Sequence, residues 1–348
     1  MLKIRKNVSL APYTSFKVGG PAKFFCEAKD EKEISEALAF AREKNLPVFV
    51  LGGGSNILVS DKGFEGVVIK ISNFKFQISN LRIVCDGGCN LGKIVSESVK
   101  SGLTGLEWAA GIPGTIGGAV WGNAGAFGGT MGDVVESVGV LEIPNLTPPP
   151  PPPLGKGGKE KGGGSKIKNF KLQDCKFSYR NSIFKENSNL IILSVTLKLK
   201  KGNKAESEKK IREILAARKI KQPTDFPSAG SFFKNPRLRQ GFGRTPPKPP
   251  ATERGQAAKI KKLMDEFEID TGKKLKDDKI PAGYLVERAW LRGKKIGGAM
   301  ISEKHSNFIV NTGRATADNV ASLAALIKTR VRNKYGIQLK EEVQYVGF

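Results

Sequence analysis

The chain has 348 residues, 39% of them hydrophobic, which is enough for two or three domains with cores of their own. Its formal net charge is +25 at pH 7, and no apolar stretch approaches the roughly 20 residues that cross a bilayer. Because the first ten residues also lack the apolar region of a secretory signal, we expect a cytoplasmic protein without a membrane span.

The first 143 residues alternate the patterns of helices and strands. An acidic capping pair, Asp30 and Glu33, opens a helix. The residues expected on its buried face are Ile34, Ala37, Leu38 and Ala41. The elements expected after it are strands at 48–51, 67–71 and 81–84, a helix at 91–100 ended by Gly102, and a further strand of the same body at 190–199.

Two glycine-rich loops stand out in this part of the chain. Residues 52–56 read Gly-Gly-Gly-Ser-Asn directly after the 48–51 strand, and residues 111–125 place glycines among Ile, Val and Trp. Glycine lets the backbone approach a ligand closely, and successive N–H groups form concave nests for phosphate oxygens. Neither loop has the ending of a P-loop or a dinucleotide fingerprint. The pair predicts a pyrophosphate held between two surfaces; the alternative is two tight turns of a β-rich domain.

The cysteines and the histidine argue against a metal site. Cys26, Cys85, Cys89 and Cys175 have the spacing of neither a zinc site nor a disulfide framework, so we expect reduced thiols. His305, the single histidine, cannot support multi-histidine metal binding.

Two segments have irregular composition. Six consecutive prolines at 148–153 precede a Gly/Lys-rich stretch, so we expect an expanded, solvated loop at 147–166, with a ligand for proline-recognition modules as the alternative. Residues 237–280 are Pro-rich and charged, with one expected helix at 257–267. This second insertion could form a lid, but its composition favours a mostly disordered tail.

The remaining elements belong to the second half of the chain. They begin with a strand at 170–177 and an amphipathic helix at 206–218, which has Ile211, Ile214 and Leu215 on one side. A helix at 316–334 follows, ending before Gly336, and the chain closes with a strand at 338–346. The apolar residues at helical spacing in the 316–334 helix are Val320, Leu323, Ala324, Ile327 and Val331.

The positive charge invites a nucleic-acid hypothesis. Lysine and arginine concentrate at 156–185, 198–221 and 237–279, which include the least complex parts of the chain, and no nucleic-acid-binding motif accompanies them. We therefore expect no nucleic-acid partner, although a basic protein would bind small anionic ligands. We also expect a monomer. A generally basic proteome explains the charge equally well.

Three polar positions suggest chemistry. Arg180 follows the expected 170–177 strand, Ser231 lies in a tight turn beside two phenylalanines, and Glu341 and Glu342 lie on the final strand. Alternation along a strand puts these two carboxylates on opposite faces, with Glu342 on the face of Gln344. Taken singly, each position also reads as an ordinary surface or turn residue.

The order of these segments resembles the UDP-N-acetylenolpyruvoylglucosamine reductases, the flavoenzymes that complete UDP-N-acetylmuramic acid for peptidoglycan. The resemblance covers nearly the whole chain apart from the two insertions. The blocks that carry it are residues 14–22, 51–61, 111–125, 179–185, 230–236, 281–287, 305–311 and 339–343.

The resemblance implies an α+β fold: a two-lobed FAD-binding domain of the vanillyl-alcohol-oxidase (PCMH) type at 1–200 and a smaller C-terminal substrate-binding domain at 201–348. It implies non-covalent FAD, whose pyrophosphate the two loops would hold. The positions it assigns to FAD are Gly52, Gly53, Gly54, Ser55, Asn56, Gly111, Ile112, Pro113, Gly114, Gly117, Gly118, Gly122, Asn123, Ala124 and Gly125.

In the family, NADPH reduces the flavin, and a hydride then passes from flavin N5 to the vinyl methylene of the enolpyruvyl ether of UDP-N-acetylglucosamine. Ser231 matches the family's proton donor, and Arg180 and Glu342 match the residues that steady the substrate carboxylate and the developing enolate. The positions that match substrate contacts are Tyr179, Asn235 and Lys221.

Besides its two insertions, at 147–166 and 237–280, this chain departs from the family pattern in two further places. Lys340 stands where a second glutamate is frequent, and the chain lacks the tyrosine-bearing insertion of one subtype, so it resembles the shorter subtype. Two rival hypotheses remain: another FAD-dependent oxidoreductase on the same fold, and a non-catalytic basic binding protein that has kept the scaffold.

Overall fold

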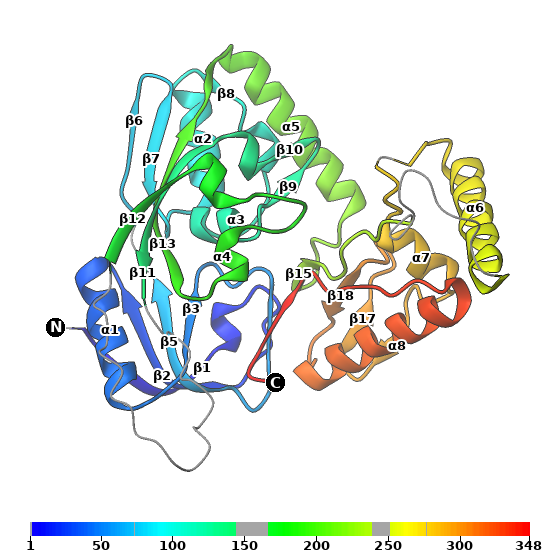
Figure 1. Ribbon diagram of the computed structural model, residues 1–348, viewed down its shortest axis with the longest axis horizontal. Coiled ribbons are helices and arrows are strands. Elements are labelled where there is room, and N and C mark those ends of the chain that lie inside the picture. The colour runs from blue at the N-terminus through cyan, green and yellow to red at the C-terminus, as the bar shows by residue number, and fades with distance from the viewer. Residues whose placement is uncertain (1, 73, 144–165, 239–250, 276) are drawn as a thin grey trace.

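The computed structural model describes residues 2–72, 74–143, 166–238, 251–275 and 277–348 (Figure 1). The polyproline segment, and with it nearly all of the expected loop at 147–166, lies outside these residues, as does the stretch 239–250 of the second insertion. Among the helices of the described ranges, none has both the length and the apolar character that a membrane crossing needs.

The chain forms two bodies, which we call the first lobe and the C-terminal domain, or second lobe. The N-terminal part of the first lobe is a four-stranded sheet covered by one helix. The strand order is β1 (Arg5–Ser9), β2 (Pro21–Ala28), β5 (Phe64–Ile71) and β3 (Val48–Leu51), with β2, β5 and β3 parallel. Helix α1 (Glu31–Glu43) begins as predicted, because the Asp30 carboxylate accepts a hydrogen bond from the Glu33 backbone N–H at 2.8 Å. Its expected buried face is confirmed.

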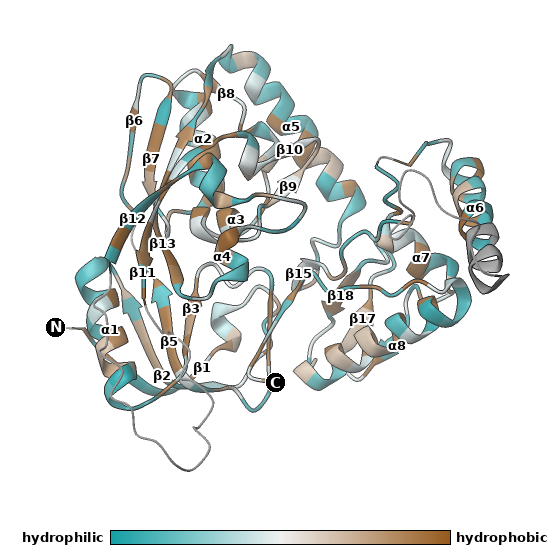
Figure 2. Ribbon diagram, in the orientation of Figure 1, coloured by the Kyte–Doolittle hydropathy of each residue, from teal (hydrophilic) through white to brown (hydrophobic). Residues whose placement is uncertain are grey.

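The second part of this lobe is a five-stranded antiparallel sheet. Its order is β12 (Lys166–Lys171), β11 (Val135–Glu142), β13 (Leu190–Lys198), β7 (Arg82–Asp86) and β6 (Phe76–Ser79). Figure 2 shows hydrophobic residues concentrated on β7, β11 and β13, whereas α5 on the outside is largely hydrophilic. The short elements around this sheet are α2 (Leu91–Lys100), β8 (Leu103–Thr104), α3 (Ile116–Trp121), β9 (Gly125–Ala126), β10 (Gly129–Thr130), α4 (Ile183–Glu186) and β14 (Lys200–Lys201).

The prediction of a strand at 170–177 was wrong over most of that range. Strand β12 ends at Lys171, and residues Leu172–Cys175 form a 3-10 turn. The Asp174 carboxylate accepts a hydrogen bond from the Lys171 backbone N–H at 2.9 Å, which starts the turn, and Lys176 leaves it with a φ of 46°. A local side-chain cap has overridden the alternating pattern here.

Helix α5 (Lys204–Lys221) packs on the first lobe, not with the second as a boundary after residue 200 would have it. The Ser207 hydroxyl donates to the buried Glu107 carboxylate at 2.6 Å, and Ile214 belongs to the core of the first lobe. The expected apolar face is only partly confirmed, since Leu215 is 45% exposed.

The C-terminal domain is an antiparallel sheet flanked by helices. Its strand order is β15 (Ser228–Ser231), β18 (Phe308–Asn311), β17 (Ala299–Ile301) and β16 (Lys295–Ile296), with α7 (Ala282–Arg288) and α8 (Ala317–Tyr335) beside it. Helix α8 is capped by Thr316 and ends before Gly336, whose φ of 71° favours glycine. The five apolar positions predicted for this helix are all buried.

The second insertion contains a longer helix than expected, α6 (Ala251–Thr271). Leu263 and Phe267 are buried in the core of the C-terminal domain, and Phe267 packs edge-on against Tyr284 with ring centroids 5.1 Å apart. In Figure 1, α6 lies on the side of this domain that faces away from the first lobe. The described part of the insertion is therefore neither a disordered tail nor a lid over the space between the lobes.

Truncating Phe267 to alanine is expected to destabilise the protein by about 3–5 kcal/mol, the usual cost of removing a buried aromatic ring. Ile269→Ala on the same helix is the matched control, because Ile269 is 82% exposed and its truncation is expected to change stability by less than about 0.5 kcal/mol. Denaturant unfolding of both variants measures the difference. Equal stabilities would show that α6 is not anchored as described.

The chain end returns to the first lobe. Strand β19 (Gln344–Val346) pairs in parallel with β4 (Ile57–Val59), directly after the first glycine loop. The expected strand at 338–346 is thus shorter, with one isolated bridge between Phe233 and Glu341 before it. This crossing carries Glu342 into the space between the lobes.

Candidate active site

A cavity of about 650 Å³ lies between the lobes, within the size range of small-molecule and cofactor sites. The first glycine loop, the second glycine loop and the end of β15 all contribute to its wall. Arg180, Ser231 and Glu342, the three expected catalytic residues, line the same cavity.

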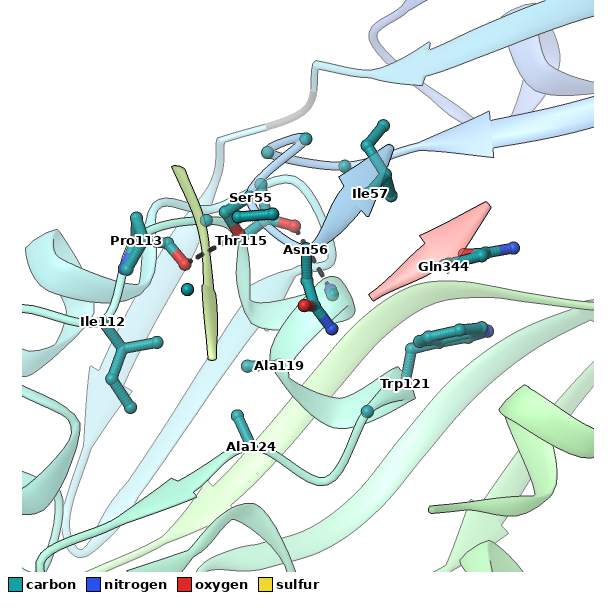
Figure 3. Close-up of a pocket in the computed structure, with 18 of the residues that line it drawn as sticks. Ser55, Asn56, Ile57, Ile112, Pro113, Thr115, Ala119, Trp121, Ala124 and Gln344 are labelled. Carbon is teal, nitrogen blue, oxygen red and sulfur yellow. Dashed lines mark hydrogen bonds between the residues drawn. The ribbon is translucent and has the colours of Figure 1, made fainter. Parts of the chain in front are cut away.

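The two glycine loops touch each other in the wall of this cavity. A Cβ on Gly53 would lie 2.5 Å from the Cα of Gly114, so backbone meets backbone at this point. The Ser55 hydroxyl donates to the carbonyl oxygen of Pro113 at 3.1 Å, a bond that Figure 3 shows as a dashed line. Glycine at position 53 is therefore required by the close approach of the loops.

The loops also present unused donors. Among the described residues, the backbone N–H groups of Gly53, Gly54, Ser55 and Asn56 have no hydrogen-bond partner, although all four residues line the cavity. Adjacent free N–H groups in a glycine loop fit the oxygens of a diphosphate. The residues present therefore fit a diphosphate-bearing cofactor such as FAD.

All expected cofactor residues except Asn123 line the cavity. Asn123 is buried, and its amide donates to the carbonyl oxygen of Ser178 at 2.8 Å and accepts from the Gly132 backbone N–H at 3.0 Å. It holds the turn that carries Arg180 and is not among the residues that line the cavity.

Replacing Gly53 with alanine is expected to push the two loops apart and to release FAD from the purified protein. Overpacking of this kind also costs about 1–3 kcal/mol of stability. Gly92→Ala in α2 is the control, because outside its own helix backbone an added Cβ would meet only the side-chain oxygen of Asn90, at 3.3 Å. The FAD content per protein measures the effect, and a fully loaded Gly53 variant would contradict it.

Arg180 is held in an unusual backbone conformation. It lies in a tight turn between Ser178 and Asn181 with a φ of 56°, which is costly for a side chain with a Cβ. Its Nη2 donates to the carbonyl oxygen of Gly125 at 2.8 Å, and its Nε lies 2.5 Å from Oε1 of Glu342. The turn thus presents the guanidinium to the cavity in a fixed orientation.

Glu342 faces Arg180 and is held by its own backbone. Its N–H donates to the carbonyl oxygen of Phe232 at 2.8 Å, and its carbonyl oxygen accepts from the Asn56 amide at 3.2 Å. Burial raises the pKa of the Glu342 carboxyl, an effect that the positive charge of Arg180 opposes. Glu341 points away and pairs with Lys328 at 2.8 Å, as the predicted alternation requires.

Ser231 closes strand β15 opposite Phe308. Gly230 before it has a φ of 76°, and the pairing of β15 with β18 is irregular at this point. No hydrogen bond from the Ser231 hydroxyl occurs within the described chain. The hydroxyl is therefore available to a bound molecule.

Of the three expected substrate residues, two lie beside Arg180 and one lies outside the cavity wall. The Tyr179 hydroxyl accepts from the Asn235 backbone N–H at 3.3 Å, so these two residues meet beside Arg180. The Asn235 side chain accepts from the Ala282 N–H at 3.0 Å at the start of α7. Lys221 is exposed at the end of α5 and is not among the residues that line the cavity.

Three cavity residues went unnoticed in the sequence. Trp121 lies at the end of α3, and Figure 3 shows it among the residues that line the cavity. Lys185 ends the 179–185 block, and its ammonium lies 4.7 Å from the Trp121 ring. Arg218 reaches the cavity from α5 and donates through Nε to the Ala110 carbonyl oxygen at 2.8 Å. Only the packing of α3, α4 and α5 brings them together.

The comparisons with known proteins agree with this geometry. Residues 22–145 match the family described as FAD binding domain, and residues 222–346 match the C-terminal domain of UDP-N-acetylenolpyruvoylglucosamine reductase. The chain is 37% identical to the reductase of that name from Caldanaerobacter subterraneus subsp. tengcongensis over 99% of this chain and 94% of the relative, and 34% identical to that of Solibacter usitatus over 99% and 97%.

A solved structure supports the same assignment. The UDP-N-acetylenolpyruvylglucosamine reductase from Thermus caldophilus has a TM-score of 0.70 and 30% identity, covering 99% of this chain and 100% of that one. The expected fold class, an FAD-binding domain followed by a smaller α+β domain, is confirmed. The chain belongs to the UDP-N-acetylenolpyruvoylglucosamine reductase family of FAD-containing oxidoreductases.

Proposed function

We propose that this protein uses NADPH to reduce UDP-N-acetylenolpyruvoylglucosamine to UDP-N-acetylmuramate, a cytoplasmic step of peptidoglycan precursor synthesis. One observation carries the proposal: a single cavity unites the two glycine loops with Arg180, Ser231 and Glu342, which come from three distant segments. FAD bound against the glycine loops would accept electrons from NADPH and supply a hydride to the vinyl methylene carbon of the substrate.

Arg180 provides the positive charge that this reaction needs. When hydride adds to the methylene carbon, negative charge develops on the neighbouring carbon and its carboxylate. A guanidinium already fixed by Gly125 and Glu342 can stabilise that charge without reorganising.

Ser231 supplies the proton. A hydroxyl is a weak acid, so it must be well placed and must act near positive charge. Its free hydroxyl lines the cavity together with Arg180, and protonation of the carbon that bears the carboxylate completes the saturated product. One hydride and one proton are added, which balances the reduction.

The substrate contacts proposed at the rim are Tyr179 and Asn235, beside Arg180. From the exposed end of α5, Lys221 is proposed to reach a substrate phosphate. We also propose a monomer without a nucleic-acid partner.

The test is NADPH oxidation by the FAD-loaded protein with and without UDP-N-acetylenolpyruvoylglucosamine. Oxidation that requires this substrate, with a product heavier by two hydrogens, supports the proposal. A loaded protein that reduces oxygen or another acceptor instead belongs to a different class of FAD-dependent oxidoreductase. A protein that retains no FAD and binds nucleic acid in a salt-dependent way fits the non-catalytic alternative.

A further inference from the structure

Lys185 is a cation in the cavity wall to which the proposed mechanism gives no role. It lies in the short helix α4, lines the cavity, and stacks on Trp121. Within the described residues its ammonium makes no hydrogen bond and no ion pair. Burial and the positive charges of Lys234 and Arg180 lower the pKa of Lys185. An ammonium has three donors, so an unpaired one in a half-buried wall is suited to an anionic ligand.

The positive charge of Lys185 is not balanced by an ion pair within the described residues. Arg180 and Glu342 are one cation and one anion in direct contact, so they neutralise each other. Lys185 is close enough to both to affect, and be affected by, their charges. Lys234 adds positive charge nearby, although it does not line the cavity.

The proposed reaction places two negative charges at one end of the substrate. Its carboxylate carries one charge before the reaction, and addition of hydride to the methylene carbon delivers an electron pair that spreads onto the same carboxylate. Two negative charges on one carboxylate need more than one guanidinium that is already paired.

We propose that Lys185 is a further catalytic residue, whose ammonium binds the substrate carboxylate and stabilises the second negative charge that it acquires. This inference rests on the proposed function. Stacking on Trp121 would hold the flexible lysine stem so that the ammonium stays at the cavity wall. Lys185 donates hydrogen bonds only, and the proton for carbon still comes from Ser231.

The experiment compares Lys185→Met, Lys185→Arg and Lys209→Met as FAD-loaded proteins. Methionine keeps the length and apolar stem but removes the charge, arginine keeps the charge, and Lys209 is an exposed residue on α5 outside the cavity. Flavin reduction by NADPH and flavin reoxidation by substrate are measured separately in single turnovers. A second readout is the binding of UDP-N-acetylmuramate and of UDP-N-acetylglucosamine, which lacks the carboxylate, followed by the flavin spectrum.

For Lys185→Met we expect reoxidation by substrate about 10- to 100-fold slower, from the loss of one charged contact, with flavin reduction unchanged. Affinity for UDP-N-acetylmuramate should fall while affinity for UDP-N-acetylglucosamine stays, and Lys185→Arg should recover most of both losses. Reoxidation equal to that of Lys209→Met overturns the inference. Loss of FAD or slower reduction by NADPH with normal reoxidation also overturns it, because Lys185 would then serve a cofactor. If the unaltered protein is not reoxidised by the substrate, the proposed function itself fails.

Discussion

Replacing Ser231 with alanine is expected to slow flavin reoxidation by UDP-N-acetylenolpyruvoylglucosamine by about 10²- to 10⁴-fold, the usual contribution of a general acid. The substrate would still bind and the flavin would still be reduced by NADPH, because the Ser231 hydroxyl holds neither loop nor strand in place. Separate single-turnover measurements of the two half-reactions check this.

Ser228→Ala is the matched control for Ser231. It lies on the same strand and lines the same cavity, and its backbone carbonyl, not its side chain, accepts the hydrogen bond from Ser15 at 2.7 Å. The control should keep both half-reactions. If Ser231→Ala also keeps them, another group delivers the proton.

Replacing Glu342 with glutamine is expected to lower the rate of the oxidative half-reaction by about 10²- to 10³-fold, the range seen when one fixed electrostatic contact is removed. The amide keeps the size of the side chain but removes the charged contact that fixes the Arg180 guanidinium, so its orientation toward the substrate is lost. Burial raises the pKa of Glu342, so the ionised form is lost as pH falls through a pKa above the ordinary carboxyl value. The pH–rate profile of the native protein should therefore fall on the acid side, and Glu342→Gln should lack that limb.

Glu341→Gln is the control for this change. Glu341 is the adjacent carboxylate, but it faces Lys328 of α8, so its neutralisation should cost at most about 1 kcal/mol of stability and leave the rate unchanged. Equal losses of rate in the two variants would mean that the position of Glu342 beside Arg180 is not what matters.

Elements with strong local signals were predictable from the sequence. Helix α2 and helix α8 carry both helical spacing and capping residues, and their bounds were found within a residue. The length of helix α6 was underestimated because its composition is polar. The burial of Leu263 and Phe267 depends on their contact with the core of the C-terminal domain. A hydrophobic pattern records burial only when enough apolar residues share one face.

The sequence predicted which of these residues belong to the candidate site, but not how they are arranged in space. The family resemblance supplied Arg180, Ser231 and Glu342, and the structure brings them to one cavity. The left-handed turn at Arg180 depends on Asn123, which holds the Ser178 carbonyl from another segment, and no local pattern encodes that contact. Lys185 was missed for the same reason, since its meeting with Trp121 is a tertiary contact between two short helices.

The proposed function is tested by single-turnover reoxidation of the reduced, FAD-loaded protein in the absence of oxygen. The protein is reduced with NADPH, freed of excess nucleotide and mixed with UDP-N-acetylenolpyruvoylglucosamine while the flavin absorbance is followed. We expect rapid return of the oxidised flavin spectrum with one UDP-N-acetylmuramate formed per flavin. A flavin that stays reduced with this substrate would contradict it.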